Sequence, residues 1–165
     1  MMQSVFQTTI IRLRQPFIFI LLMGFGLSSC DRNRFYEQSS TVDPIWIYSD
    51  GKTFDVKIAD TLKYYNFYIN VRNTIDYEFA NLYFFIQTDL PDGKAARDTV
   101  ECQLADYQGK WLGNGSGEFR DNRFLIRKNM RFLRSGNYHF VLKHGMRPDS
   151  LKGITDVGIR IEIAK

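Results

Sequence analysis

The chain reads Tyr64-Tyr65-Asn66-Phe67-Tyr68-Ile69-Asn70-Val71. Aromatic and branched residues at every second position of this segment alternate with tyrosine and asparagine. A period of two places alternate side chains on opposite faces of an extended chain, so that one face can be buried while the other meets water. Tyr, Phe, Ile and Val also suit a pleated, half-buried surface. The segment therefore predicts a β-strand.

The same period of two recurs on both sides of this segment. It predicts further strands over 54–58, 82–86, 100–104, 124–126, 138–142 and 157–163. Residues that favour turns lie between the predicted strands, namely Asp50-Gly51, Pro91-Asp92-Gly93, Gly113-Asn114-Gly115, Asp121-Asn122 and Gly136-Asn137. No amphipathic helix lies between the strands, as a parallel sheet would require. We therefore predict an all-β, antiparallel β-sandwich, either a jelly roll or Greek-key-like, with at most one short helical turn near residues 145–151.

The first thirty residues have the features of an exported lipoprotein. Arg12 and Arg14 precede an apolar run of about twelve residues, shorter than the ~20 that a membrane-spanning helix needs. The run ends in Leu27-Ser28-Ser29-Cys30, which resembles the lipobox, the pattern in which a cysteine thiol is acylated and the chain is cut just before it. The alternative is an ordinary secretory signal with a coincidental cysteine. We predict lipidation at Cys30, detectable as incorporated palmitate.

Cleavage before Cys30 would divide the chain into three parts. Residues 1–29 are the predicted lipoprotein signal peptide. Residues 30–43 are polar and short of aliphatic side chains, which predicts an acylated tether. Residues 44–165 are then a single β-sandwich domain. Removing 29 of the 165 residues leaves 136, which is enough for one hydrophobic core.

The net charge of the mature protein bears on whether it could bind nucleic acid. Without the two basic residues of the signal, the formal charge falls from +4 to +2. No run of Lys and Arg interleaved with aromatics occurs, so nucleic-acid binding is not predicted.

Cys102 is the only cysteine besides Cys30, and an acylated Cys30 cannot form a disulfide with it. Its alternation with Val100 and Leu104 predicts a buried thiol that behaves as a small apolar side chain.

The sequence offers no recognisable catalytic or metal-binding set. His139 and His144 are the only histidines, and no HExxH, Cys-x-x-Cys or glycine-flanked serine motif occurs. Carboxylates are scattered, so the facing pair that a glycoside hydrolase needs is not indicated. We therefore predict that the protein is not an enzyme and has no catalytic, cofactor-binding or metal-binding residues.

Four aromatic residues are candidates for an interaction surface: Trp46, Tyr83, Phe85 and Trp111. Trp111 opens a glycine-rich stretch, where it either packs as a lid over the core or lies exposed against a sugar ring or a protein partner. Tyr83 and Phe85 belong to residues 81–86, which are apolar on both faces. Other parts of the domain must cover these two side chains, or they form an exposed patch.

Arg72 follows the strand predicted at 64–71 and has two interpretations. It could clamp a ligand, or it could pair with a nearby carboxylate such as Asp76 or Glu78. We favour the ion pair, because the five fixed donors of a guanidinium serve architecture as readily as they serve recognition.

Several segments, taken in order, resemble the GldH family, the gliding-motility lipoproteins of the Bacteroidota. These segments are Cys30 with Tyr36-Glu37, Trp46, 65–73, 77–83, 98–101 with 104–106, 109–113, 136–138, and 146–154 leading to 156–158. The resemblance implies an outer-membrane lipoprotein that is tied to surface gliding and the associated secretion apparatus, without a known catalytic residue. The residues after Cys30 lack an acidic cluster resembling the surface-export tag of this phylum, which favours the periplasm-facing side.

Two functions are consistent with these features. The first is a lipid-anchored, non-catalytic structural or interaction component of the gliding-motility and associated secretion machinery, whose partners are the membrane and proteins of an envelope complex. The second is a carbohydrate-binding module that stacks a polysaccharide on Trp46, Trp111 or the strand tyrosines, an interpretation that rests on analogy between β-sandwiches.

Overall fold

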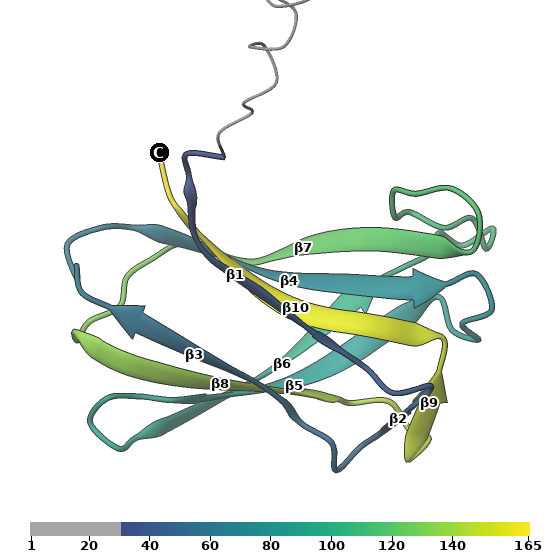
Figure 1. The fold of residues 1–165 in the computed structure, drawn as a ribbon, viewed down its shortest axis with the longest axis horizontal. Helices are drawn as coiled ribbons and strands as arrows, with labels where there is room; N and C mark the ends of the chain where they lie inside the picture. Colours follow the sequence, from purple (N-terminus) through teal and green to yellow (C-terminus); the bar gives the residue numbers. More distant parts are fainter. Residues whose placement is uncertain (1–30) are drawn as a thin grey trace, which may run out of the picture. The chain divides into compact units, whose positions relative to one another are not determined.

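The computed structural model describes residues 31–165, and residues 33–165 form its folded unit (Figure 1). The signal peptide and the lipidation predicted at Cys30 lie outside the described residues. The described part contains no helix, and therefore none long and apolar enough to cross a membrane. The strands are β1 (Arg34–Thr41), β2 (Ile45–Ile47), β3 (Lys52–Ile58), β4 (Tyr65–Thr74), β5 (Asn81–Asp89), β6 (Ala95–Gln103), β7 (Phe119–Met130), β8 (Gly136–His144), β9 (Ser150–Lys152) and β10 (Ile154–Ile163).

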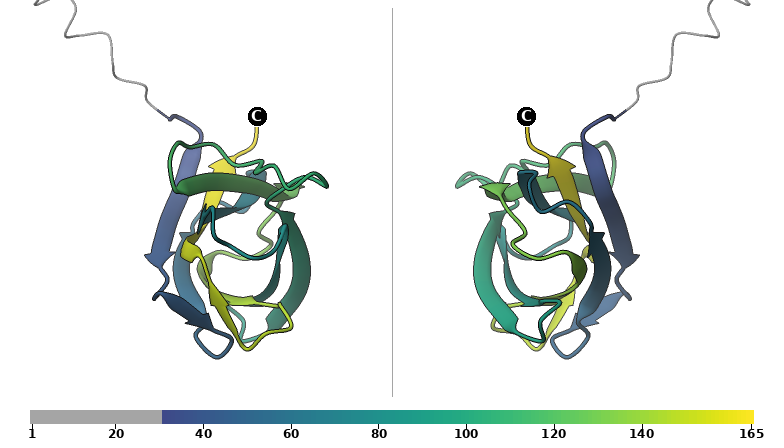
Figure 2. Two further views of the ribbon diagram at one scale, coloured as in Figure 1. Left: turned by 90° about the vertical axis from the view of Figure 1, so that its right-hand side faces the viewer. Right: turned by 90° about the vertical axis from the view of Figure 1, so that its left-hand side faces the viewer.

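Two four-stranded antiparallel sheets enclose a common interior, as the end-on views of Figure 2 show. One sheet has the order β1-β10-β4-β7 and the other β3-β8-β5-β6, while β2 and β9 form a two-stranded ribbon. The prediction of an all-β, antiparallel sandwich is confirmed. The stretch near residues 145–151, where the sequence allows one helical turn, instead leads into β9, because Leu151 pairs with Trp46 of β2.

β4 contains residues 65–71 and lies inside its sheet, between β10 and β7. Tyr65, Phe67, Ile69 and Val71 are all buried, and the residues between them point away from the interior. The strand with one buried face that the period of two predicts is therefore confirmed. Each buried aromatic or branched side chain contributes roughly 1.5–3 kcal/mol relative to exposure.

The opposite wall of the core comes from β5 and β8. Leu82 and Phe84 of β5 are fully buried. Across the interior, the rings of Phe67 and Phe140 stack with centroids 5.3 Å apart and an interplanar angle of 25°. Cys102 is also fully buried, as its alternation with apolar neighbours predicts. Side chains from both sheets thus build one continuous core.

The composition predicts a tether over residues 30–43, whereas residues 34–41 form the edge strand β1. This strand pairs with β10 along its length. Tyr36 packs against the core, and the Phe35 ring centroid lies 5.3 Å from that of Tyr65. Polar residues can occupy an antiparallel strand whose outer face meets water, so a segment poor in aliphatics can still complete a sheet. The folded unit consequently begins at residue 33 rather than 44.

The turn predicted at Asp121-Asn122 is absent, because both residues lie inside β7. Asp121 lies opposite Arg72 of β4, and Asn122 Nδ2 donates a hydrogen bond of 2.9 Å to Asn73 Oδ1. Cross-strand partners therefore satisfy side chains that would otherwise favour a turn. The chain turns earlier, where Gly117 adopts a φ of 67°, a conformation that suits glycine.

Candidate interaction surfaces

Exposed apolar side chains lie on the outer face of the β3-β8-β5-β6 sheet and on β2, which belongs to the β2–β9 ribbon. Tyr83 and Phe85 occupy alternate positions of β5, so their side chains leave the same face. Phe85 is 41% exposed, and the Tyr48 ring meets it edge-to-face with centroids 6.4 Å apart. Tyr48 follows β2, whose Ile45 and Ile47 are exposed as well. We call Ile45, Ile47, Tyr48 and Phe85 the β2–β5 surface.

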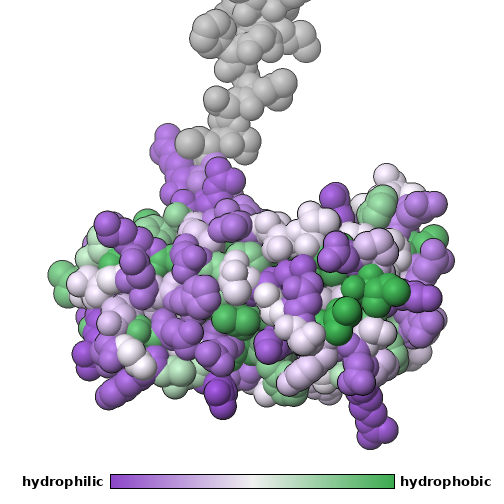
Figure 3. Space-filling model, turned by 60° about the horizontal axis from the view of Figure 1, so that its bottom comes forward, coloured by the Kyte–Doolittle hydropathy of each residue, from purple (hydrophilic) through white to green (hydrophobic). Residues whose placement is uncertain are grey.

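The β2–β5 surface borders a hollow of about 440 Å³. The residues that line it are Tyr48, Phe85, Ile86, Gln87, Arg97, Asp98, Thr99, Val141 and Lys143. Lys143 Nζ lies 5.7 Å from the Tyr48 ring centroid, where a cation is attracted to the aromatic face. Figure 3 shows an apolar area on this side of the molecule, surrounded by polar residues, at the place where Figure 1 shows β2. A hollow that combines aromatic rings with cationic and amide groups can bind a protein segment or a sugar.

Trp46 is excluded as an exposed stacking residue, because its side chain is fully buried and its Nε1 donates to the Asp50 carbonyl over 2.8 Å. The isoleucines on either side of it, and Tyr48, were missed by sequence reasoning. The signal was present in Ile45-Trp46-Ile47, since a period of two puts the isoleucines on the face opposite the indole. Burial of the larger Trp46 therefore exposes both Ile45 and Ile47.

The structure brings Tyr83 close to the β2–β5 surface but gives Trp111 a different place. A hydrogen bond to Glu101 raises the pKa of Tyr83, which also borders a smaller hollow of about 370 Å³ with Met146. Trp111 is half-buried against the core and bridges to Ala105, as expected for the packed-lid alternative. Trp111 does not line the hollow beside Phe85.

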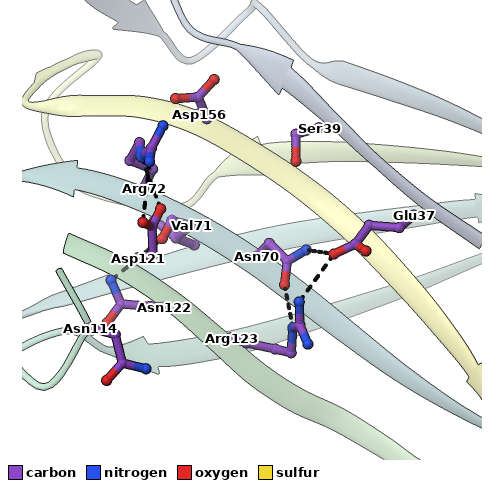
Figure 4. A pocket seen from close by; sticks show the side chains of 10 residues that line it. All are labelled: Glu37, Ser39, Asn70, Val71, Arg72, Asn114, Asp121, Asn122, Arg123 and Asp156. Carbon is purple, nitrogen blue, oxygen red and sulfur yellow. Dashed lines mark hydrogen bonds and ion pairs between the residues drawn. The ribbon is translucent and has the colours of Figure 1, made fainter. Parts of the chain in front are cut away.

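A second hollow, of about 690 Å³, crosses the outer face of the other sheet (Figure 4). Its lining residues are Glu37, Ser39, Asn70, Val71, Arg72, Asn114, Asp121, Asn122, Arg123 and Asp156. On one side Glu37 Oε1 accepts hydrogen bonds from Asn70 Nδ2 at 3.0 Å and from Arg123 Nη2 at 3.1 Å. On the other side Arg72 donates through Nε and Nη2 to the two oxygens of Asp121, at 2.9 and 3.2 Å. We call this hollow the polar groove.

Gly158 of β10 makes the polar groove possible. A Cβ at this position would lie 2.5 Å from the Gln38 carbonyl oxygen and 2.6 Å from Ser39 Oγ. Because Gly158 has no side chain, Glu37 on β1 can reach past β10 to Asn70 on β4. Burial acts to raise the pKa of Glu37, but the hydrogen bonds and charges around it, from Arg160 above all, hold this pKa below its usual value.

The charged groups of the polar groove are satisfied by one another. Arg72 pairs with Asp121 rather than with Asp76 or Glu78, because the β4–β7 register places Asp121 directly opposite. Asp156 accepts a hydrogen bond from Thr41 Oγ1 at 3.2 Å. A ligand would have to displace these bonds, so the groove is better explained as sheet architecture than as a binding site.

A third hollow, of about 460 Å³, opens between β6 and β7, which are edge strands of their sheets. Its apolar lining comes from the core and includes Phe67, Ile86, Ile126, Met130, Phe132 and Phe140. At its mouth Arg127 Nη2 lies 2.7 Å from Asp98 Oδ1, and this ion pair links the two sheets. The hollow is therefore an apolar space behind a charged rim.

The cysteine and the two histidines of the described residues are buried or paired. Burial raises the pKa of Cys102 to about 12, which leaves little thiolate at neutral pH. His139 Nδ1 lies 2.7 Å from Asp55 Oδ1 on the outer face of its sheet. His144 is fully buried, and neither ring nitrogen has a partner at hydrogen-bonding geometry within the described part. Between residues 31 and 165, no three His, Cys, Asp or Glu side chains are grouped to hold a metal ion.

Comparison with known proteins identifies close relatives in sequence. The family model for the GldH lipoprotein matches residues 34–161. The gliding motility lipoprotein GldH homolog of Christiangramia forsetii is 33% identical over 153 residues, which cover 88% of this chain and 92% of the relative. The gliding motility lipoprotein GldH of Flavobacterium johnsoniae is 32% identical over 150 residues, which cover 87% of this chain and 93% of the relative.

Comparison with solved structures gives a weaker likeness. A structure of infectious bursal disease virus, Gx strain, is 12% identical with a TM-score of 0.31, over 79% of this chain and 33% of that chain. A likeness at this level carries no argument about function. The family match, by contrast, begins at the first residue of β1 and ends within β10, so it spans both sheets. The chain belongs to the GldH lipoprotein family.

Proposed function

We propose that this protein is a lipid-anchored component of the bacterial outer membrane, facing the periplasm, and that it serves the gliding-motility and associated secretion machinery in a structural, non-catalytic role. The observation that carries this proposal is the family match over the whole sandwich, together with two relatives named as gliding motility lipoproteins. The lipobox ending at Cys30 supports the anchor. Two or more acyl chains bind a membrane firmly where one alone is marginal.

The β2–β5 surface supports an interaction role. Phe85 is 41% exposed and Ile47 is 52% exposed, although both are large apolar side chains. Contiguous apolar side chains on a protein surface commonly mark sites where a partner binds. Lys143 at the rim adds a charge that can orient such a partner. We assign the β2–β5 surface as the docking face for another protein of the envelope complex.

The proposal is tested in a gliding strain that lacks its own copy of the gene. Complementation with the wild-type gene should restore colony spreading and single-cell movement, and a Cys30→Ala allele should not. Cys102→Ala is the matched control, because it removes the other cysteine but keeps the anchor. Normal movement in the deletion strain, or full rescue by Cys30→Ala, would count heavily against the proposal.

A carbohydrate-binding role is the alternative, favoured by the hollow beside Tyr48 and Phe85. Aromatic rings, the Gln87 amide and the Arg97 guanidinium line this hollow, and these are groups that hold sugars through stacking and hydrogen bonds. Affinity electrophoresis in gels containing envelope polysaccharides distinguishes the two roles. Retardation that a Tyr48→Ala and Phe85→Ala double variant loses would favour sugar binding, whereas unchanged mobility in every gel would exclude it for that panel.

A further inference from the structure

Two loops carry the most exposed large aliphatic side chains of the described residues. Leu62 in the β3–β4 loop is 78% exposed, and Leu133 in the β7–β8 loop is 83% exposed. Neither is a residue that the core or the β2–β5 surface uses. Apolar side chains exposed at loop tips are available to enter the boundary between headgroups and acyl chains when a membrane lies against them.

Hydrogen bonds place both loops at the end of the sandwich where β1 begins. Arg131 Nη2 donates to the Thr61 carbonyl over 3.1 Å, which joins the β7–β8 loop to the β3–β4 loop. The Ala164 amide donates to the Tyr64 carbonyl over 2.9 Å, and the neighbouring Ile163 amide donates to the Asn33 carbonyl over 2.8 Å. Figure 1 shows both loops at the same, left-hand end of the sheets. We call this region, with Leu62 and Leu133 at its tips, the anchor end.

The covalent distance from Cys30 to the fold is short. Because β1 starts at Arg34 and Asn33 is bonded to β10, only three residue steps separate Cys30 from a residue that the sheet holds. An extended chain covers at most ~3.3–3.6 Å per residue, so Asn33 can lie no more than about 11 Å from Cys30. An acyl group on Cys30 would therefore hold the domain close to the lipid headgroups, which the longer tether predicted from composition would not do.

The side chains around the two leucines fit an interface of lipid and water. The β5–β6 loop, residues 90–94, adjoins the β7–β8 loop, because Arg134 Nη2 lies 3.3 Å from Asp92 Oδ2. The cationic side chains of the three loops are Lys63, Lys94, Arg131 and Arg134, against Asp60 and Asp92. The excess of positive charge suits anionic headgroups. Tyr64 is 52% exposed, and Arg131 lies 5.6 Å from its ring centroid. Tyrosine and arginine at the border of an apolar contact are typical of the headgroup region.

We propose that the anchor end lies on the bilayer surface, with Leu62 and Leu133 inserted among the headgroups, so that the protein is oriented as well as tethered. This inference rests on the proposed acylation of Cys30. The β2–β5 surface then extends away along the outer face of the β3-β8-β5-β6 sheet, and the loops at the other end of the sheets point away from the membrane.

Depth-dependent fluorescence quenching tests the orientation on the acylated mature protein, which begins at Cys30. Leu62→Cys, Leu133→Cys and Tyr107→Cys variants each receive an environment-sensitive dye and are reconstituted into vesicles of phosphatidylethanolamine and phosphatidylglycerol that contain a nitroxide-labelled lipid. Tyr107 is the matched control, because it is 95% exposed in the β6–β7 connection. Cys102 stays unlabelled, since it is fully buried, and the unsubstituted protein measures any background.

The expected result is strong quenching at positions 62 and 133 and none at position 107. No quenching at 62 and 133 in protein that floats with the vesicles would overturn the orientation while leaving the anchor intact. Quenching at 107 that matches the other two positions would overturn it as well. Failure of the protein to float with the vesicles would instead reject the anchor, and the proposed function with it, so the two failures are distinguishable.

Discussion

Arg160 on β10 donates from Nη1 to Glu37 Oε2 on β1 over 2.6 Å, and only 4% of the Arg160 side chain is exposed. The other oxygen of Glu37 accepts bonds from Asn70 and Arg123, so one carboxylate of the edge strand is tied to each of the other three strands of the sheet. These bonds explain why a polar segment forms strand β1 instead of an unpaired tether. Because β1 begins at Arg34, they also limit the distance between Cys30 and the folded domain.

Glu37→Gln tests this role. The amide keeps the shape but loses the charge that Arg160 faces, so we expect a loss of about 1–3 kcal/mol in the free energy of unfolding. Because the pKa of Glu37 is lowered in the folded state, its contribution is present above the usual value of 4.5 and is lost as the pH falls below it. Denaturant unfolding between neutral and acidic pH measures both effects, and the variant should show a shallower acid dependence. The exposed Glu118→Gln is the control, and an equal loss there would contradict the assignment.

His144 should make stability fall as the medium becomes mildly acidic. Its ring is fully buried, and burial lowers its pKa below 6.5, although nearby backbone groups of Asp149 and Trp46 act in the opposite direction. A histidine with a lowered folded pKa stays neutral in the fold but binds a proton in the unfolded chain, so stability is full above 6.5 and declines as the pH drops through the folded pKa. Unfolding curves for His144→Phe should lack this decline. A decline of the same size in His144→Phe would mean that another group causes it.

Substitution of Trp46 should destabilise the fold far more than substitution of Phe85. Trp46→Ala removes a fully buried ring and should cost about 3–5 kcal/mol. Phe85→Ala removes a ring that is 41% exposed and should cost about 1 kcal/mol or less. Thermal or chemical unfolding of the two variants side by side gives the comparison. Similar losses for both would show that Phe85 belongs to the core instead of a docking face.

The β2–β5 surface predicts a defect in function without a defect in folding. A Tyr48→Ala and Phe85→Ala double variant should be produced, anchored and folded at wild-type levels but should restore colony spreading only weakly in a gliding strain. Leu125→Ala is the control, since Leu125 is 48% exposed on the outer face of the other sheet. Full spreading by the double variant, or an equal defect in Leu125→Ala, would show that the β2–β5 surface is not a docking face.

The inner strands of the sheets were predictable because burial on one face dictates the residue types. Ile69 of β4 and Phe84 of β5 lie in runs with a clear period of two, and both are fully buried. Such a run has one stable arrangement, since a shift by one residue would turn its apolar side chains to water. The buried Cys102 followed from the same pattern.

The edge strand β1 and the strand pairings were not predictable, because they depend on partners far away in the sequence. β1 is polar, and Glu37 is held in the sheet by Arg160 of β10, Asn70 of β4 and Arg123 of β7. Arg72 likewise pairs with Asp121, forty-nine residues away in the sequence, because the β4–β7 register places the two residues opposite each other. These pairings join residues that are distant in the sequence, so a local pattern does not reveal them.

Membrane attachment depends on Cys30 becoming the acylated amino terminus of the mature protein. Metabolic labelling with tagged palmitate, followed by separation of membranes from soluble material, measures this step. We expect label in the wild-type protein and its recovery with outer membranes, and neither in Cys30→Ala. An unlabelled wild-type protein that keeps residues 1–29 and remains in the cytosol would show that Cys30 is not a lipid anchor.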